Sequence, residues 1–351
     1  MNNKTYILIT LMSLFFINMT FSQGCEGDDL TASDSLSANS IKIFGYIQPE
    51  YDYNFTDGNE NTFKFRRARI GVRGKVYDDF SYYFMLETSP FIGSSGDAYL
   101  MDAFVTYDKY NWARVSVGSF KQPFSLDVST PCNALITIDR SIVADQLVAP
   151  QRDFGLMLLG GNKYTKFNYA VALMNGRGLK VKDDNTKKDI IGRLTYRLTS
   201  YLTVGGSFRY GYPIPNNNDD SRTSVGGEFA LDLDKFKIQG EYIYDEGAYF
   251  LGSGGGCGAT PVSLGERRDG AYIMAFYNVN EKFQPVFKYE YFDPNLDVKD
   301  NISYVYQERM TLGANYYFND KVRLQINYQA NIQTVINVDD DALIAQIQVK
   351  F

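Results

Sequence analysis

Apolar and polar residues alternate along the chain from Ile41 to the final residue, Phe351. The alternation comes in stretches of about ten residues, separated by polar turns or longer polar links. A period of two is typical of β-strands that have one apolar and one polar face. The last stretch has an apolar face of Leu343, Ala345, Ile347, Val349 and Phe351, and a polar face of Gln346, Gln348 and Lys350. Such strands build the wall of a transmembrane β-barrel.

Sixteen stretches of this kind follow one another along the chain. They begin at about residues 41, 62, 80, 98, 112, 153, 166, 189, 201, 223, 236, 270, 283, 303, 321 and 342. An even number is typical of a barrel whose two ends lie on the same side of the membrane. We therefore predict an all-β fold, a sixteen-stranded antiparallel transmembrane β-barrel over residues 41–351. The alternative is a large soluble β-sandwich or barrel, in which shorter strands with more outward charges are expected.

The links between these stretches alternate in length. Short turns, such as 77–79, 109–111 and 319–320, follow even-numbered strands and are predicted to face the periplasm. Longer links, such as 175–188, 213–222 and 246–269, are predicted to be extracellular loops. The longest link, about 121–152, is the third loop and is rich in apolar residues. We expect it to fold inward and narrow the lumen, because the inner wall is the surface available for its packing.

The N-terminal region differs from the rest of the chain. An apolar run follows Lys4, and small polar residues come after it, so residues 1–23 are predicted to be a cleaved secretory signal peptide. Residues 24–40, rich in Gly, Asp, Ser and Ala, are predicted to be a flexible periplasmic tail. No other stretch approaches the roughly 18 apolar residues of a membrane helix. The sequence thus indicates export to a bacterial outer membrane. The 28 Tyr and 25 Phe suit the aromatic girdles of a barrel.

The sequence contains no histidine, which excludes Ser-His-Asp and Cys-His nucleophiles and every His-ligated metal site. No pair of carboxylates stands out for glycoside cleavage, so we expect neither an enzyme nor a cofactor. The three cysteines leave alternatives open. Cys132 and Cys257 fall in predicted outer loops, where a disulfide can form. Cys25 is either a lipid-modified N-terminus or a free thiol.

A run of basic residues lies on the second predicted strand, 63–76. Alternation directs Ala68, Ile70, Val72 and Val76 to the lipid, and so directs Arg67, Arg69, Arg73 and Lys75 to the lumen. The opposite assignment would place four cations in hydrocarbon at about 2–4 kcal/mol each. Arg66 shares the lipid-facing parity and is expected near the headgroups.

The same alternation predicts more inward cations than inward acids. The cations are Arg114, Arg193, Arg197, Arg209, Lys237, Lys288, Arg309, Lys321, Arg323 and Lys350, and the acids are Glu87, Asp102, Glu228, Asp232, Glu241 and Glu290. The lumen is therefore expected to be cationic, although the chain has a formal net charge of -6. Such a wall attracts anions, and arginine suits phosphate-like oxygens. In the alternative interpretation, the lumen arginines only pair with the lumen carboxylates.

Four segments resemble the phosphate-selective porin O and P family of outer-membrane channels. They are 66–75 with the following 77–82, then 118–126, 139–141 and 152–155. The resemblance implies a trimeric sixteen-stranded barrel whose third loop enters the lumen and forms a constriction lined by lysine and arginine. By matched motif, Lys121, Arg140 and Arg152 are candidates for this constriction. Asp127, Asp139 and Asp145 in the same loop depart from an all-cationic one.

These observations together predict a passive outer-membrane channel that prefers small anions, with phosphate or polyphosphate as candidates. The expected anion-binding residues are Arg67, Arg69, Arg73, Lys75, Arg114, Lys121, Arg140 and Arg152. The expected partners are small inorganic anions, outer-membrane lipid, the assembly machinery of that membrane and two further copies of the chain, and no nucleic acid. The alternative function is a structural or surface-attachment barrel with a plugged lumen.

Overall fold

A computed structural model describes residues 41–56, 60–91, 97–162, 164–250, 262–298, 304–333 and 340–351. The signal peptide, the tail, Cys25 and Cys257 lie outside these ranges, so the lipid-modification and disulfide hypotheses stay predictions. Within the described ranges, no helix has the length and apolar character needed to cross a membrane.

Sixteen strands make up most of the described chain. They are β1 (Ile41–Asn54), β2 (Asn61–Val76), β3 (Phe80–Glu87), β4 (Tyr99–Tyr110), β5 (Ala113–Lys121), β6 (Arg152–Gly160), β7 (Phe167–Met174), β8 (Asp189–Arg197), β9 (Leu202–Gly211), β10 (Arg222–Leu233), β11 (Phe236–Gly247), β12 (Arg267–Tyr277), β13 (Phe283–Asp293), β14 (Gln307–Tyr317), β15 (Val322–Gln333) and β16 (Ala342–Lys350). The helices of the described part are short, namely η3 (Ser89–Phe91), α2 (Leu126–Ser129) and α3 (Ile142–Leu147).

Each strand pairs antiparallel with its sequence neighbours, and β1 pairs with β16, so the sheet closes into a barrel. The predicted sixteen-stranded antiparallel fold is confirmed. Most strands begin within one residue of the predicted position, and two differ by more. β12 begins at Arg267 because Arg267 and Arg268 pair in register with Glu246 and Asp245 of β11. β14 begins at Gln307 rather than at residue 303.

The two faces of the wall differ as alternation predicts. Large apolar side chains on the outer face are exposed in the isolated chain, for example Phe63 at 83% and Ile70 at 43%. An apolar surface of this extent on every strand fits contact with lipid. The inner face carries most of the buried charged and amide side chains.

A β-bulge changes the direction of one basic residue. The register between β1 and β2 shifts between Gln48 and Pro49, because Gln48 pairs with Arg67 whereas Pro49 pairs with Phe65. Arg66 is the extra residue, and its guanidinium reaches Glu50 at 3.7 Å and also Asp139 of the third loop. The expectation that Arg66 lies near the lipid headgroups is therefore wrong. Strict alternation fails at a bulge, where one inserted residue re-aims its side chain.

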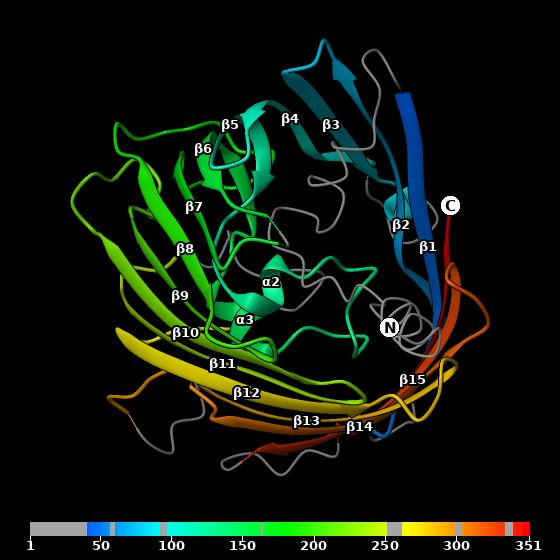
Figure 1. Cartoon of the computed structure of the whole chain (residues 1–351). Coiled ribbons are helices and arrows are strands. Elements are labelled where there is room, and N and C mark those ends of the chain that lie inside the picture. Colours follow the sequence, from blue (N-terminus) through cyan, green and yellow to red (C-terminus); the bar gives the residue numbers. More distant parts are fainter. Residues whose placement is uncertain are drawn as a thin grey trace, which may run out of the picture.

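The third loop, residues 122–151, joins β5 to β6 and carries α2 and α3. Figure 1 shows both helices within the outline of the ring of strands. α3 contacts β11, β12 and β13, on the side of the barrel far from β5 in the sequence. The loop thus crosses the lumen.

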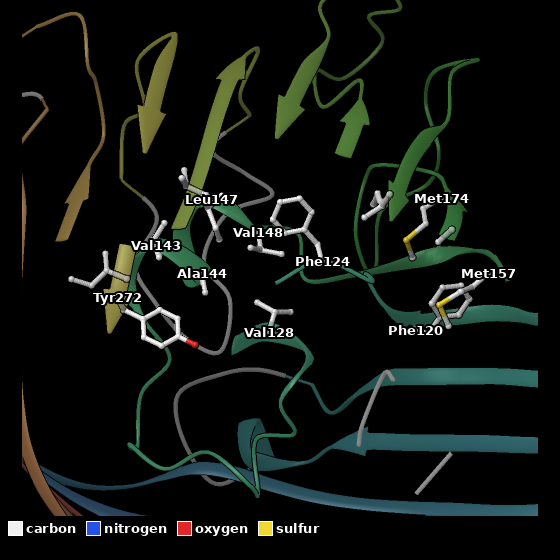
Figure 2. Close-up of a cluster of buried hydrophobic side chains, with 14 of the residues drawn as sticks. Phe120, Phe124, Val128, Val143, Ala144, Leu147, Val148, Met157, Met174 and Tyr272 are labelled. Atoms are coloured by element: carbon white, nitrogen blue, oxygen red, sulfur yellow. The ribbon is translucent and has the colours of Figure 1, made fainter. Parts of the chain in front are cut away.

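Apolar packing holds part of the loop against the inner wall. Phe124, Val128, Val143, Leu147 and Val148 are each 0% exposed and belong to one buried cluster. Wall residues from β3 to β13 complete that cluster, among them Met85, Phe120, Met157, Met174 and Tyr272. Figure 2 shows the loop side chains gathered beside Tyr272 of β12, with Met157 and Met174 on neighbouring strands. Burial of a side chain of this size contributes about 1.5–3 kcal/mol.

Candidate functional site in the barrel lumen

The wall opposite this apolar cluster is lined by amide side chains that bind the backbone of the loop. Asn315 of β14 donates to the Ile136 carbonyl at 3.0 Å, and Gln325 of β15 donates to the same oxygen at 3.1 Å. Gln348 of β16 and Gln48 of β1 donate to the carbonyls of Asn133 and Cys132. We call this surface, Gln48, Asn315, Gln325, Asn327, Gln329 and Gln348, the amide wall. It fixes the path of residues 132–139 across the pore.

Wall charges of opposite sign hold the two ends of α3. At its N-terminus, Glu290 of β13 accepts a hydrogen bond from Ile142 N at 2.7 Å. At its C-terminus, Arg209 of β9 and Arg222 of β10 each donate to the Leu147 carbonyl at 2.7 Å. Both contacts have the favourable sign for a helix dipole. Arg209 and Arg222 therefore bind the loop and hold the C-terminus of α3 against the wall.

A glutamate holds α2 in a similar way. Glu241 of β11 accepts hydrogen bonds from the Ser125 hydroxyl and from the backbone N–H groups of Leu126 and Asp127. Ser125 caps the helix by accepting from Val128 N. The sequence prediction that Glu241 faces inward agrees with this contact, and the structure adds that the carboxylate is occupied by the loop.

The basic residues of β2 lie in three different surroundings. Arg69 forms an ion pair with Glu87 of β3 at 2.7 Å and donates to the Tyr46 hydroxyl at 2.6 Å. Arg67 donates to Gln48 of the amide wall, and Arg73 lies 5.4 Å from the centre of the Phe44 ring. Lys75 approaches Asp108 at 4.0 Å near the periplasmic end. The alternative interpretation, that lumen arginines pair with lumen acids, thus describes Arg69 on β2, and it also describes Arg193, which pairs with Glu228.

Arg114 and Lys121 lie near the two ends of β5 (Ala113–Lys121), and both line one cavity between the loop and the wall. With Arg193 of β8 they line a small cavity of about 40 Å³ between β5 and β8. Arg114 donates to the Gly161 carbonyl at 2.7 Å, and Arg193 forms hydrogen bonds with Glu228 of β10, one of them at 3.0 Å. The cavity therefore combines the guanidinium groups of Arg114 and Arg193 with the ammonium group of Lys121. The carboxylate of Glu228 binds Arg193 beside it.

Arg140 and Arg152 bind within the loop region, and Arg152 of β6 is the direct cross-strand partner of Lys121. Arg140 is 1% exposed and lies within the loop, where it donates to the Thr130 carbonyl and lies 3.8 Å from Asp127. Arg152 forms an ion pair with Asp102 of β4 at 3.0 Å. Both residues connect parts of the loop region to each other or to the wall.

The tip of the loop carries a buried acid among cations. Burial raises the pKa of Asp139, but Arg66, Arg309 and Lys288 outweigh it and hold the pKa well below its usual range. Gln329 of the amide wall also donates to this carboxylate at 2.9 Å. Asp139 is thus charged at every physiological pH and fixes the loop tip to β2 and β15.

Several basic residues gather at the periplasmic end of the seam between β1 and β16. A cavity of about 540 Å³ there has five basic lining residues and one acidic one; these are Lys42, Arg73, Lys321, Arg323 and Lys350, and Asp320. We call it the cationic cavity. Of these, Arg73 was a predicted site residue, and Lys321, Arg323 and Lys350 were predicted to face inward. Lys42 was missed, although its position in the alternation of β1 carries the same signal.

Sequence reasoning missed several lumen acids. Glu50 of β1 and Asp245 of β11 are 3% and 0% exposed. Asp245 lies in contact with Arg209, Arg222 and Arg268, so that one carboxylate serves three guanidinium groups. Around Glu50 and Asp245, positive and negative side chains in the lumen are therefore closer in number than the sequence predicts. In the described part of the chain, no group of three or more His, Cys, Asp or Glu residues forms a metal site.

Comparison with known proteins places the chain in a family. The profile of the family described as Phosphate-selective porin O and P matches residues 41–225 and 214–351. The chain belongs to this porin family. Porin O of Pseudomonas aeruginosa is 34% identical over 96 residues, which cover 26% of this chain and 22% of that protein. The match thus spans less than a quarter of the relative, and the family assignment depends on the profile.

Solved porins share the fold of this porin. The anion-selective porin from Comamonas acidovorans matches with a TM-score of 0.63 at 13% identity, over 89% of this chain and 99% of that one. OmpT of Vibrio cholerae, solved in a trimer form, matches with a TM-score of 0.59 at 13% identity, over 90% of this chain and 100% of that one. The porin is therefore a β-barrel of the bacterial outer membrane.

Proposed function

We propose that this porin is a passive channel that prefers small anions. The observation that carries the proposal is the cationic cavity, whose lining holds five basic side chains and one acidic side chain. Such an arrangement raises the local anion concentration, because the protein focuses the field along the path. Membership of the porin O and P family and the similarity of the fold to an anion-selective porin support the same preference.

The proposed path runs past the third loop. Arg67 and Arg69 are buried beside the loop and add to the positive field, and anions reach Arg73 and Arg323 in the cationic cavity, from which they leave to the periplasm. Arg114 and Lys121 form a second basic group across the lumen. Arg140 and Arg152, together with Arg209 and Arg222, position the loop and shape the constriction. Phosphate and polyphosphate are the candidate solutes, because arginine binds their oxygens in bidentate fashion.

The zero-current potential across a planar bilayer tests the anion preference. Purified porin in a KCl gradient is expected to give the sign of an anion-selective pore, and the double substitution of Arg73 and Arg323 by alanine is expected to lower the anion-to-cation permeability ratio about twofold to tenfold. The matched control is Arg267→Ala on the outer face, where the side chain is 54% exposed. A cation-selective sign would overturn the proposal. Absence of any conductance step would favour the plugged, surface-attachment barrel.

Phosphate preference has a separate test. Chloride current is measured while phosphate or sulfate is added, in the native porin and in Arg69→Ala and Lys121→Ala. Stronger inhibition by phosphate, weakened in either variant, is the expected result. Equal inhibition by the two ions would remove the phosphate label and leave the anion channel intact.

We further propose that the porin forms a homotrimer, as the trimer form of OmpT supports. Its mass in detergent, measured by light scattering, tests this arrangement, and a monomeric mass would contradict it.

A further inference from the structure

The loop divides the periplasmic half of the lumen into two cavities. Besides the cationic cavity, a larger one of about 1250 Å³ lies on the side of β8 to β14. Pro131, Ala134 and Tyr317 line both cavities. The stretch of loop that is tied to the amide wall therefore acts as the partition, with a different lining on each side.

The larger cavity is electrically balanced. Four basic residues, Arg193, Lys235, Lys237 and Lys282, and four acidic ones, Asp127, Glu228, Asp234 and Glu281, line it. Those inside the barrel have ionic partners, because Arg193 binds Glu228, Lys237 binds Asp232 at 2.9 Å and Asp127 lies 3.8 Å from Arg140. The other four lie in the periplasmic turns or next to them. An ion entering this cavity meets no net field like that of the cationic cavity.

Apolar and aromatic side chains line the cavity between these ion pairs. Met274 and Phe276 of β12 face the lumen, and Leu135 and Ile136 line the cavity from the loop. Gln239, Gln284 and the hydroxyl groups of Thr195 and Thr203 supply hydrogen-bonding groups on the same lining. A porin lumen is ordinarily polar and filled with water. An apolar patch such as the one that Leu135, Ile136, Met274 and Phe276 form, with hydrogen-bonding groups beside it, is instead typical of a small-molecule site.

We infer that this larger cavity binds uncharged organic molecules that combine an apolar, ring-shaped face with hydroxyl groups, so that the barrel handles two solute classes on the two sides of its loop. The apolar face packs on Phe276 and Met274, and the hydroxyl groups exchange hydrogen bonds with the amides and threonines. Charged solutes gain little there, because the charged side chains of the lining inside the barrel already have ionic partners. The inference depends on the proposed channel function only for access to the cavity from water.

Equilibrium binding to the purified, detergent-solubilised porin tests this site. Three probes are compared: phenyl β-D-glucoside is neutral with an aromatic ring, glucose lacks that ring, and phenyl β-D-glucuronide keeps the ring and adds a negative charge. We expect phenyl glucoside to bind about fivefold to tenfold more tightly than glucose in calorimetry. The glucuronide is expected to bind no more tightly than glucose in this cavity.

Paired variants assign the binding to the cavity. Phe276→Ala removes an aromatic face and Ala230→Lys places a charge in the lining, so each is expected to weaken phenyl glucoside binding about fivefold to tenfold. Arg323→Gln changes the other cavity and is expected to leave this binding unchanged while it lowers anion selectivity. Migration of unheated protein in gels verifies that each variant is a folded barrel; Ala230→Lys keeps the test decisive should Phe276→Ala fail to fold.

Two results would overturn the inference. One is equal affinity for phenyl glucoside and glucose, and the other is loss of phenyl glucoside binding in Arg323→Gln but not in the two cavity variants. The zero-current potential of the same samples separates this outcome from failure of the anion channel. A cation-selective pore with intact phenyl glucoside binding would contradict the proposed function and leave this site in place.

Discussion

At the scale of single residues, the position of a charged residue in the alternation determines whether its side chain faces the lipid or the lumen. A β-bulge reverses this direction for the residue that it inserts. Arg67, Arg69 and Arg73 point inward as their parity requires. Arg66 also points inward, because Pro49 pairs with Phe65 and leaves Arg66 as the extra residue. Its contacts with Glu50 and Asp139 then tie the loop tip to β2.

Removal of the ion pair between Arg66 and Asp139 is expected to destabilise the docked loop. Arg66→Gln leaves Asp139 buried without its nearest cation, so the free energy of unfolding is expected to fall by about 1–3 kcal/mol. Denaturant titration in detergent measures the change. Arg267→Gln is the control, because Arg267 forms an equally close but exposed pair with Asp297 and should show no measurable effect. Equal losses in the two variants would contradict the assigned role of Arg66.

A second residue makes the loop sensitive to pH. Burial raises the pKa of Asp145 to about 7, with Arg140 opposing the rise and Asp127 and Asp139 adding to it. The unfolded chain releases this proton near pH 4. The folded state therefore holds more protons than the unfolded state between about pH 4 and pH 7, and the contribution of Asp145 to stability decreases as the pH rises through that window.

Asp145→Asn is expected to reduce this dependence. Unfolding midpoints of the native porin and the variant are compared at several pH values from about 4 to about 8. The amide cannot ionise and keeps an acceptor for Gln151, which donates to Asp145 at 2.9 Å. A variant whose midpoint follows pH as steeply as that of the native porin would contradict the assignment.

At the scale of elements, the strands were predictable and the loop only in part. Successive side chains of a pleated strand point to opposite faces, and one face of each strand contacts lipid. The resulting period of two predicted the sixteen strands and most of their first residues. The apolar content of residues 121–152 indicated an inward loop. The contacts of Glu241 with α2 and of Glu290 with α3 were not predictable, because they join residues more than a hundred positions apart and no local pattern records them.

The charge at the N-terminus of α3 is expected to matter for the current. Glu290→Gln keeps an acceptor near Ile142 N and removes the negative charge, at a cost of about 0.3–2 kcal/mol to the docked helix. More frequent brief fluctuations in single-channel recordings are the expected result. Glu308→Gln on β14 is the control, because that carboxylate accepts hydrogen bonds from tyrosines on the outer face. Equal noise in both variants would assign the effect to general loosening of the wall.

At the scale of the whole molecule, closure of the sheet brings together the first and last strands, β1 and β16, and forms the cationic cavity at their seam. Lys42 and Arg73 come from β1 and β2, whereas Arg323 and Lys350 come from β15 and β16. Parity predicted that Arg73, Arg323 and Lys350 face inward. Their gathering at one seam depends on the register of closure, which alternation along a single strand does not contain.

Engineered disulfides test that register. Ile47 and Val349 are opposite each other across the β1 and β16 seam, so cysteines at both positions are expected to form a disulfide in a background that lacks the native cysteines. The control combines Ile47→Cys with Leu343→Cys, which lies six residues away on the same strand and should not form one. Mobility in non-reducing gels reports the outcome. A bridge in the control alone would contradict the observed closure.

The amide wall has a consequence for how this porin can change over time. Asn315, Gln325 and Gln348 donate hydrogen bonds to backbone carbonyl oxygens of the loop. Every amino acid has such an oxygen, so these contacts do not depend on particular side chains of the loop. Substitutions among residues 133–136 can therefore alter the partition between the two cavities while its backbone course is preserved. Solute preference and barrel stability are thus separable traits, and selection can adjust the first with little loss of the second.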